Sequence, residues 1–212
     1  MEPAFWLKKW QAHEIGFHQT DIHPLLLAHW AALGFASGQR VLVPLCGKSR
    51  DLSWLAARGL EVIGFELSEL AVQAFFREHE LEPCVVEVDS YVRFSAPGMT
   101  IFCGDFFQVS LASCAPCDAV YDRAALIALS PTQREPYLNA LRRLCRSQAR
   151  GLLITVEYPD GVVSAPPFSI PRSEIEDRYR GWARLEELER RAADVKGQPA
   201  LEVAYAFGLS GS

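Results

Sequence analysis

Short apolar runs alternate with amphipathic stretches along the chain, which is the pattern of strands followed by helices. Residues 41–45 and 62–67 are apolar runs of the length of strands buried on both faces. Between them, residues 51–58 carry apolar side chains at helical spacing, and Gly59 is placed to end that helix. These residues predict a strand–helix–strand unit around which the rest of the chain is organised.

The same pattern predicts further elements on both sides of this unit. Trp6 and Trp10 are four residues apart, so they would share one face of a helix. Residues 82–98 hold only short apolar pairs and predict an irregular stretch, and residues 159–171, with four prolines, predict a long loop. Helices are expected over residues 24–33, 69–79, 131–146 and 173–179, and strands over residues 99–103, 117–120, 151–158, 183–190 and 201–209.

This alternation of strands and helices predicts an α/β fold with a mainly parallel sheet and right-handed crossovers. The last two strands have only a short connection, which predicts an antiparallel hairpin at one edge of the sheet. The sequence shows no internal repeat and no linker, so residues 1–212 are interpreted as a single domain. Within it, residues 1–35 are interpreted as a helical lid or substrate segment.

Composition narrows the function classes. The 212 residues are 50% hydrophobic and 22% charged, as in ordinary globular proteins, and the net charge is −5. A general nucleic-acid binder needs a basic face, so that class is not favoured. No apolar run approaches the length of a membrane span, and the N-terminus lacks a signal-peptide core. A monomer in the cytoplasm is the expectation.

The cysteine and histidine positions do not predict a metal site. Cys114 and Cys117 have the spacing of a metal-binding or redox pair, but no second pair completes a set of four ligands. The histidines near the N-terminus are not spaced as metal ligands on one helix face. We therefore expect free thiols in a reducing compartment and no bound metal.

The turn after the first strand is a candidate cofactor site. It contains Gly47, and Glu66 follows 19 residues later at the end of the second strand. An acid about 20 residues after a glycine turn accepts hydrogen bonds from ribose hydroxyls in nucleoside-binding folds. This spacing predicts an adenosine-containing cofactor.

The glycines that a phosphate group would need are missing from this turn. A phosphate-binding loop ending at Gly47-Lys48-Ser49 would need a glycine at position 42, where Leu42 stands. The GxGxxG fingerprint of nicotinamide-cofactor sites is also absent, which disfavours a nicotinamide oxidoreductase. S-adenosylmethionine (AdoMet) has an adenosine and no phosphate, so it fits better than either nucleotide class.

Several motifs resemble the thiopurine S-methyltransferase family over essentially the whole chain: FWLKKW, FHQ, PLCGKS, GFELSELAVQAFF, YDRAAL and PPF. The resemblance, which is to a bacterial member, implies the seven-stranded Rossmann-like fold of AdoMet-dependent methyltransferases. It also implies methyl transfer to the sulfur of an aromatic or heterocyclic thiol. Bacterial relatives are associated with methylation of selenium and tellurium compounds and with tellurite resistance, which extends the expected acceptors.

The resemblance implies a set of cofactor-binding residues. Trp10 would cover the methionine end of AdoMet, Leu45 would supply backbone contacts, and Glu66 would accept both ribose hydroxyls. Asp105 and Phe106 occupy positions that flank adenine, where the animal enzyme has a serine–isoleucine pair. The expected roles are acceptance of the adenine amino group by Asp105 and apolar contact by Phe106.

The expected substrate contacts are Phe17, Arg123 and Arg190. By resemblance, Arg123 lies beside the cofactor's carboxylate and the substrate pocket; a salt bridge with Asp122 or Glu157 is the structural alternative. No catalytic base is assigned, because an aromatic thiol is largely ionised near neutral pH; His18 is the spare candidate. O- or N-methyl transfer and a non-enzymatic cofactor-binding module remain as alternative functions.

Overall fold

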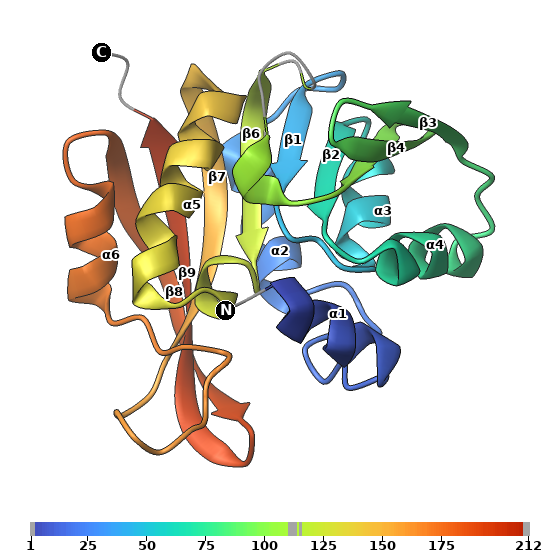
Figure 1. Cartoon of the computed structure of the whole chain (residues 1–212). Coiled ribbons are helices and arrows are strands. Elements are labelled where there is room, and N and C mark those ends of the chain that lie inside the picture. Colours follow the sequence, from blue (N-terminus) through green and yellow to red (C-terminus); the bar gives the residue numbers. More distant parts are fainter. Residues whose placement is uncertain (1–2, 110–113, 115, 210–212) are drawn as a thin grey trace.

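The structure, a computed structural model, describes residues 3–109, 114 and 116–209. Helices and strands alternate along the chain (Figure 1). The helices and 3-10 turns are α1 (Pro3–Gln11), α2 (Pro24–His29), η1 (Trp30–Leu33), α3 (Asp51–Ala56), α4 (Glu69–Glu78), η2 (Phe106–Gln108), η3 (Leu126–Ala128), α5 (Pro131–Leu144) and α6 (Arg172–Tyr179). The strands are β1 (Arg40–Val43), β2 (Glu61–Glu66), β3 (Cys84–Val88), β4 (Tyr91–Ala96), β5 (Met99–Cys103), β6 (Cys117–Arg123), β7 (Cys145–Glu157), β8 (Ala183–Val195) and β9 (Gln198–Leu209).

These strands form one sheet in the order β3-β4-β5-β2-β1-β6-β7-β9-β8. The central strands β5, β2, β1, β6 and β7 run parallel to one another. The last two strands form a long antiparallel hairpin, and β9 of that hairpin pairs antiparallel with β7. The α/β class, the mainly parallel sheet and the C-terminal hairpin predicted from the sequence are therefore confirmed.

The predicted strand number was too low. Within the described residues the sheet has nine strands, not seven, because residues 84–96 form the hairpin β3–β4 instead of an irregular stretch. Asp89 adopts a left-handed φ of 52° in the two-residue turn of this hairpin. Its outer strand β3 is exposed along almost its whole length, with Val85 at 52%. Such an edge strand lacks the alternation of buried and exposed positions that identifies a strand in a sequence.

Other boundaries also differ from the sequence prediction; β6, β8 and β9 are longer than predicted and α5 is shorter, and two further cases have a clear local cause. The predicted helix over residues 24–33 is α2 followed by η1, and Gly34 ends it with a left-handed φ of 67°. Strand β7 begins at Cys145 rather than at Gly151, because polar, largely exposed residues extend its pairing with β6. Polar residues of this kind give no hydrophobic signal.

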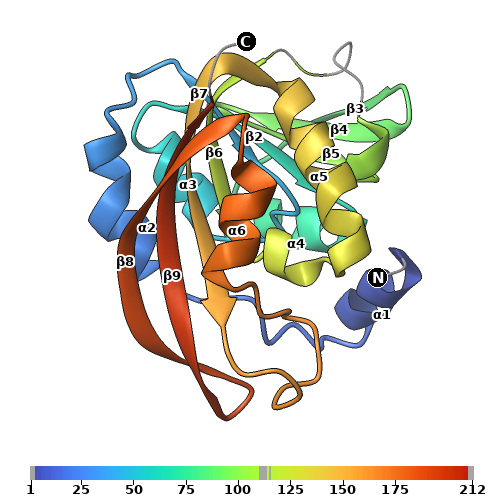
Figure 2. The ribbon, with the colours of Figure 1, turned by 90° about the vertical axis from the view of Figure 1, so that its left-hand side faces the viewer.

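Helices cover both faces of the sheet and bury two hydrophobic cores. Helices α2 and α3 lie on one face, and α5 and α6 lie on the other (Figure 2). On the first face, Leu25, Leu52 and Phe75 pack with strand residues, and all three are fully buried. On the second face, Tyr137 of α5 and Tyr179 of α6 belong to the other core. The strands between the helix layers are therefore buried on both sides, as their apolar runs require.

The order of the strands places a switch point at β1. This strand pairs with β2 on one side and with β6 on the other. The chain first crosses from β1 to β2 and later returns from β5 to β6, on the opposite side of β1. In open α/β sheets, ligands bind at the carboxyl ends of the strands beside such a switch point. Helix α1 and the loop between β7 and α6 both lie at the end toward which β6 and β7 point (Figures 1 and 2).

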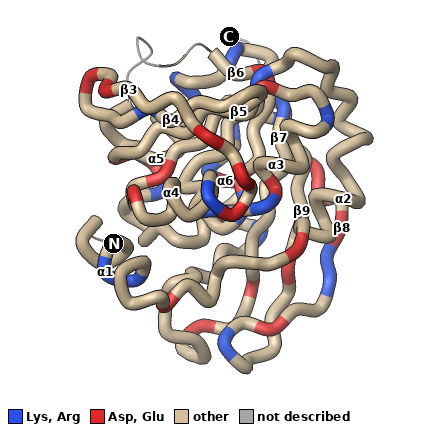
Figure 3. The backbone as a smooth tube through the Cα atoms, turned by 90° about the vertical axis from the view of Figure 1, so that its right-hand side faces the viewer, with Lys and Arg blue, Asp and Glu red and all other residues tan. Residues whose placement is uncertain are grey.

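Charged side chains of both signs are spread over the molecule. In the view of Figure 3, lysine and arginine positions are scattered among aspartate and glutamate positions. Across the described residues, no helix is long and apolar enough to cross a membrane.

Candidate active site

Four neighbouring parallel strands end at the same edge of the sheet, and a predicted site residue stands at or just after each end. Leu45 follows β1, Glu66 ends β2, Asp105 follows β5 and Arg123 ends β6. These strands are adjacent in the order β5-β2-β1-β6, so the sheet brings the four positions together.

The turn after β1 is tightly curled and supports helix α1. Leu45 and Gly47 have left-handed φ angles of 48° and 55°. The Cys46 N–H donates to the Phe65 carbonyl at 2.9 Å, which ties the turn to β2. A Cβ atom at Gly47 would lie 3.3 Å from Cζ2 of Trp10, so the indole ring rests directly on the glycine. Glycine suits this position because it adopts a left-handed φ without strain and leaves room for the indole ring.

Glu66 presents a buried carboxylate beside this turn. Its side chain is 6% exposed, Oε2 accepts the Gly47 N–H at 2.8 Å, and Oε1 accepts the Ser68 N–H at 2.8 Å. Burial raises the pKa of Glu66, and the backbone donors at Ser68 and Gly47 oppose that rise. A carboxylate has about four acceptor sites, so each oxygen can accept one more donor. Two adjacent hydroxyl groups of a ribose match that remaining capacity.

The aromatic residues of the N-terminal segment form a compact cluster. The Phe17 ring lies 5.7 Å from Trp6 and 5.6 Å from Trp10, and both contacts are edge-to-face. Trp10 is 7% exposed, whereas Phe17 is 37% exposed. Because Trp10 also rests on Gly47, this cluster stands at the carboxyl end of β1. It offers a flat apolar surface on which a planar ring could pack.

Asp105 and Phe106 differ in their surroundings. Asp105 is half-buried and caps η2, since Oδ1 accepts the Phe107 N–H at 3.0 Å. Phe106 is 1% exposed and packs in the core, 5.4 Å from the Phe65 ring and 5.4 Å from the Tyr137 ring. Asp105 Oδ2 accepts a long hydrogen bond from Gln108 Nε2 at 3.4 Å, while Phe106 forms part of the core beneath the strand ends.

Arg123 is held by Asp51 and Ser49, to which the sequence patterns gave no role in the site. Its Nε donates to Asp51 Oδ2 at 3.0 Å, and its Nη2 donates to Ser49 Oγ at 3.1 Å. From the sequence, a salt bridge with Asp122 or Glu157 was the alternative role of Arg123. Neither bridge occurs among the described contacts of Arg123. Asp122 instead accepts the Tyr137 hydroxyl at 2.7 Å on the other face of the sheet. The only sequence signal for Asp51 was its position as an acid in the first turn of a predicted helix.

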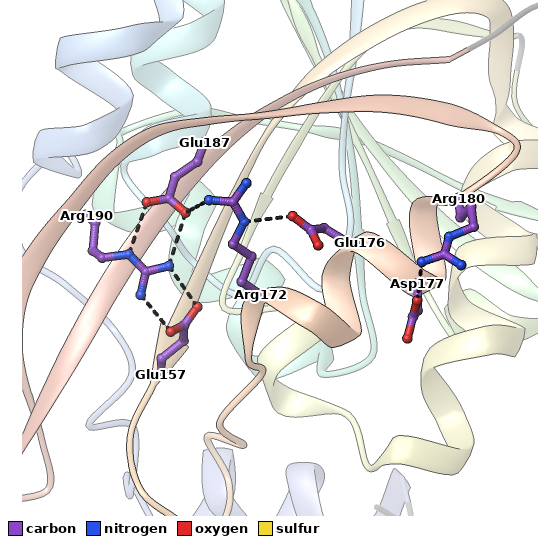
Figure 4. Close-up of polar contacts among 7 residues, drawn as sticks. All are labelled: Glu157, Arg172, Glu176, Asp177, Arg180, Glu187 and Arg190. Carbon is purple, nitrogen blue, oxygen red and sulfur yellow. Dashed lines mark hydrogen bonds and ion pairs between the residues drawn. The ribbon is translucent and has the colours of Figure 1, made fainter.

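Arg190 lies on β8 in a cluster of charged side chains (Figure 4). Nη1 donates to Glu157 Oε2 at 2.7 Å, and Nε donates to Glu187 Oε1 at 3.0 Å. Nη2 donates to both carboxylates, so all three guanidinium nitrogens have acidic partners. Arg172 joins the cluster through Glu187 at 3.3 Å. No described contact joins Arg190 to the other site residues.

His18 stands close to the basic groups of the site. Burial lowers its pKa, and the positive charges of Lys48, Arg123 and Arg50 lower it further. Glu78 opposes this effect, while its carboxylate accepts from Lys48 Nζ at 2.6 Å. These surroundings therefore favour the neutral form of the His18 imidazole.

All six cysteines lie among the described residues, and none of them forms a disulfide bond. Cys114 and Cys117 share a hydrogen bond at the start of β6, at the sheet edge opposite the site. In the part of the chain that the structure describes, no group of three or more histidine, cysteine or acidic side chains is arranged to hold a metal ion.

Solved structures with the same fold include methyltransferases with bound S-adenosylhomocysteine. A Burkholderia thailandensis 1,6-didemethyltoxoflavin-N1-methyltransferase with bound S-adenosylhomocysteine superposes with a TM-score of 0.68 at 15% identity, covering 99% of this chain and 87% of that one. A Synechocystis magnesium protoporphyrin IX methyltransferase with bound S-adenosylhomocysteine gives a TM-score of 0.65 at 13% identity, covering 97% and 99%. At such identities the likeness shows the fold.

Sequence comparison is more specific. A thiopurine S-methyltransferase from Pseudomonas aeruginosa is 46% identical over 197 residues, which covers 93% of this chain and 89% of that protein. One from Pseudomonas entomophila is 47% identical over 189 residues, covering 89% and 87%. The thiopurine S-methyltransferase family model matches residues 1–206. Together with the fold and the residues gathered at the strand ends, these matches show that the chain belongs to the thiopurine S-methyltransferase family.

Proposed function

We propose that this protein transfers the methyl group of AdoMet to the sulfur of an aromatic or heterocyclic thiol and releases S-adenosylhomocysteine. Selenium and tellurium compounds are further acceptors under this proposal. The observation that carries it is the convergence of an acceptor carboxylate, an aromatic surface and an arginine at one sheet edge. Relatives at 46% identity carry the name thiopurine S-methyltransferase, which supports sulfur as the acceptor atom.

The residues at the strand ends suit the parts of AdoMet. Glu66 would accept both ribose hydroxyls with the acceptor capacity that Gly47 and Ser68 leave free. Backbone groups at Leu45 would line the cofactor beside it. The half-buried Asp105 carboxylate would accept the adenine amino group. Phe106 would support the adenine from the core side.

The methionine end of the cofactor would lie between Trp10 and Arg123. The face of an indole ring attracts a positive charge, so Trp10 suits the sulfonium group. A guanidinium pairs well with a carboxylate, so Arg123 suits the methionine carboxylate and the neighbouring substrate pocket. Phe17, the more exposed aromatic residue, would pack on the acceptor ring.

AdoMet supplies an electrophilic methyl group, so the task of the protein is to position the acceptor and adjust its charge. The nucleophile is the thiolate, which aromatic thiols form readily near neutral pH. The cationic surroundings of His18 favour that anion, so no dedicated general base is needed, and His18 stays the spare candidate for that role. The aromatic cluster excludes water from the reacting atoms.

Arg190 would contact the substrate as part of its ion-pair cluster. Its three nitrogens are shared with Glu157 and Glu187, so a substrate anion would have to replace one of these carboxylates. Arg190 would therefore be an exchangeable substrate contact and not a fixed anchor.

The same proposal covers the organisation of the chain. Residues 1–35 serve as a lid that carries Trp10 and Phe17 over the site, and residues 1–212 act as one catalytic domain. The protein works as a monomer in the cytoplasm, where its six cysteines stay reduced. Light scattering measures the molar mass of the purified protein in solution and so tests whether it is a monomer.

An acceptor panel tests the proposed function. Purified protein is incubated with AdoMet and, separately, a thiopurine, thiophenol, selenite, tellurite, phenol and aniline, and S-adenosylhomocysteine release is measured. We expect the two thiols to give turnover and phenol and aniline to give none. Turnover with phenol or aniline alone would favour O- or N-methyl transfer. Tight S-adenosylhomocysteine binding without any turnover would favour a non-enzymatic module.

A further inference from the structure

A buried carboxylate joins three segments of the chain beneath Arg123. Asp51, at the start of α3, is 1% exposed. Its Oδ2 accepts from the Tyr121 hydroxyl at 2.9 Å and from Arg123 Nε at 3.0 Å. Its Oδ1 accepts the backbone N–H of His23 at 2.9 Å, where the N-terminal segment enters α2. Both oxygens are therefore used, and one of them is shared with the arginine.

Ser49 completes the support for the guanidinium. Its Oγ accepts from Arg123 Nη2 at 3.1 Å and from the Asp51 N–H at 3.2 Å. The Nη1 group of Arg123 has no hydrogen-bond partner among the described contacts. Arg123 thus uses two of its three nitrogens to fix its own orientation, and Nη1 is left available. The side chain is 12% exposed, so only a small part of it is open to solvent.

Tyr121 keeps the shared oxygen in place. Burial raises the pKa of its phenol, and the neighbouring Asp51 carboxylate raises it further. The hydroxyl therefore stays protonated and donates to Asp51 at every physiological pH. A long arginine side chain loses rotamer freedom when a ligand orders it, and a fixed carboxylate removes that cost before the ligand arrives.

We propose that Asp51 is a positioning residue for methyl transfer: it fixes the guanidinium of Arg123 so that Nη1 faces the ligand, and Ser49 assists it. The inference rests on the proposed function for the role of Arg123. It adds that the bond to the His23 backbone sets the entry of the N-terminal segment relative to the same arginine. Asp51 itself does not touch the cofactor or the acceptor.

A double-mutant cycle tests this. The variants are Asp51→Asn, Arg123→Gln and the double variant, and each is measured for kcat/KM with thiophenol and for S-adenosylhomocysteine affinity by calorimetry. The introduced asparagine can still accept the His23 N–H through its carbonyl oxygen, but its amide N–H₂ cannot accept from Arg123. A hydrogen bond between charged groups contributes enough that we expect Asp51→Asn alone to lower kcat/KM roughly tenfold to a hundredfold. In the Arg123→Gln background the same change should have an effect of less than about twofold.

Two further variants separate positioning from general damage. Asp118→Asn is the matched control, because Asp118 also accepts a backbone N–H, that of Arg40 at 2.9 Å, and pairs with Arg146 at the opposite end of β6. It should keep full turnover. If Asp51→Asn does not fold, Ser49→Ala replaces it; a loss of a few-fold that disappears in the Arg123→Gln background is then expected.

Losses from Asp51→Asn and Arg123→Gln that multiply in the double variant would overturn the inference, because they would show independent roles. An Arg123→Gln variant with unchanged affinity and unchanged kcat/KM would also overturn it. Failure of the proposed function looks different: no variant, nor the parent protein, would methylate thiophenol. In that case the double-mutant cycle, measured as S-adenosylhomocysteine affinity by calorimetry, would still decide whether Asp51 acts through Arg123.

Discussion

Glu66 illustrates how a single residue serves both the fold and the site. The carboxylate closes the turn after β1 through Gly47 and begins α4 through Ser68, at 2.8 Å in each case. Burial disfavours its charge, and the backbone donors stabilise that charge again. The negative group is therefore held in a fixed place before any ribose arrives, which is the preorganisation that binding requires.

Replacing Glu66 with glutamine should weaken the binding of S-adenosylhomocysteine. One amide N–H₂ would face a backbone donor, and one acceptor for the ribose would be lost. Hydrogen bonds to a charged acceptor contribute about 1.5–3 kcal/mol, so calorimetry should show a loss of affinity of roughly tenfold to a hundredfold. The exposed Glu87→Gln variant is the control and should bind normally. Unchanged affinity in Glu66→Gln would remove this residue from the ribose site.

The residues of the site differ in how far the sequence predicts them. Spacing from Gly47 was enough to predict Glu66 as an acceptor at a strand end, and family resemblance supplied Arg123. Asp51 and Ser49 could not be found in this way. Their partner Arg123 lies 72 and 74 residues later, and only the pairing of β6 with β1 brings them together. A non-local ion pair leaves no local pattern in the sequence.

At the level of elements, α1 depends on the turn that it covers. It has 9 residues, fewer than an isolated helix needs to be stable in water. Its one buried side chain, Trp10, rests on Gly47. The helix therefore owes its order to this contact and to the aromatic cluster with Phe17.

Trp10→Ala should release α1. Large-to-small changes of buried aromatic residues cost about 3–5 kcal/mol, more than a helix of this length can supply by itself. Hydrogen exchange measured by mass spectrometry should show loss of protection over α1 and little change in the sheet. In the parent protein, S-adenosylhomocysteine should increase that protection. Lys8→Ala on the exposed face is the control; if Trp10→Ala exchanges like Lys8→Ala, the lid interpretation is wrong.

Elements with a buried apolar face were predictable, whereas the exposed hairpin β3–β4 was not. Residues 99–103 were predicted as a strand and form β5 with the same bounds. The hairpin β3–β4 was missed because β3 pairs at the sheet edge through its backbone and buries little. Hydrogen bonding along an edge depends on the neighbouring strand, and apolar periodicity does not report it.

At the level of the whole molecule, Asp122 connects stability to pH. It is fully buried between β6 and α5, and burial raises its pKa to about 6, while bonds from Tyr137 and Leu126 oppose the rise. An unfolded chain has an aspartate pKa of about 3.9. The folded state therefore binds this proton more tightly. The stability that the proton contributes is complete below about pH 4 and is lost as the pH rises through 6.

The pH dependence of the free energy of unfolding should therefore differ between the parent protein and Asp122→Asn. Urea unfolding at pH 5 and pH 7.5 should show that the parent protein loses about 1.4 kcal/mol more than the variant between the two pH values. Asparagine does not titrate, so the difference isolates this carboxyl group. Exposed Asp21→Asn serves as the control. Equal changes in the parent protein and Asp122→Asn would mean that Asp122 does not titrate in this range.

The central claim is that the methyl group is transferred to sulfur, and the product of one reaction tests it. The protein is incubated with AdoMet labelled with carbon-13 in the methyl group and a heterocyclic thiol that also carries ring nitrogens. Nuclear magnetic resonance of the purified product then locates the labelled carbon. We expect the label on sulfur alone. A label on a ring nitrogen, or no product from a protein that binds S-adenosylhomocysteine, would contradict the account.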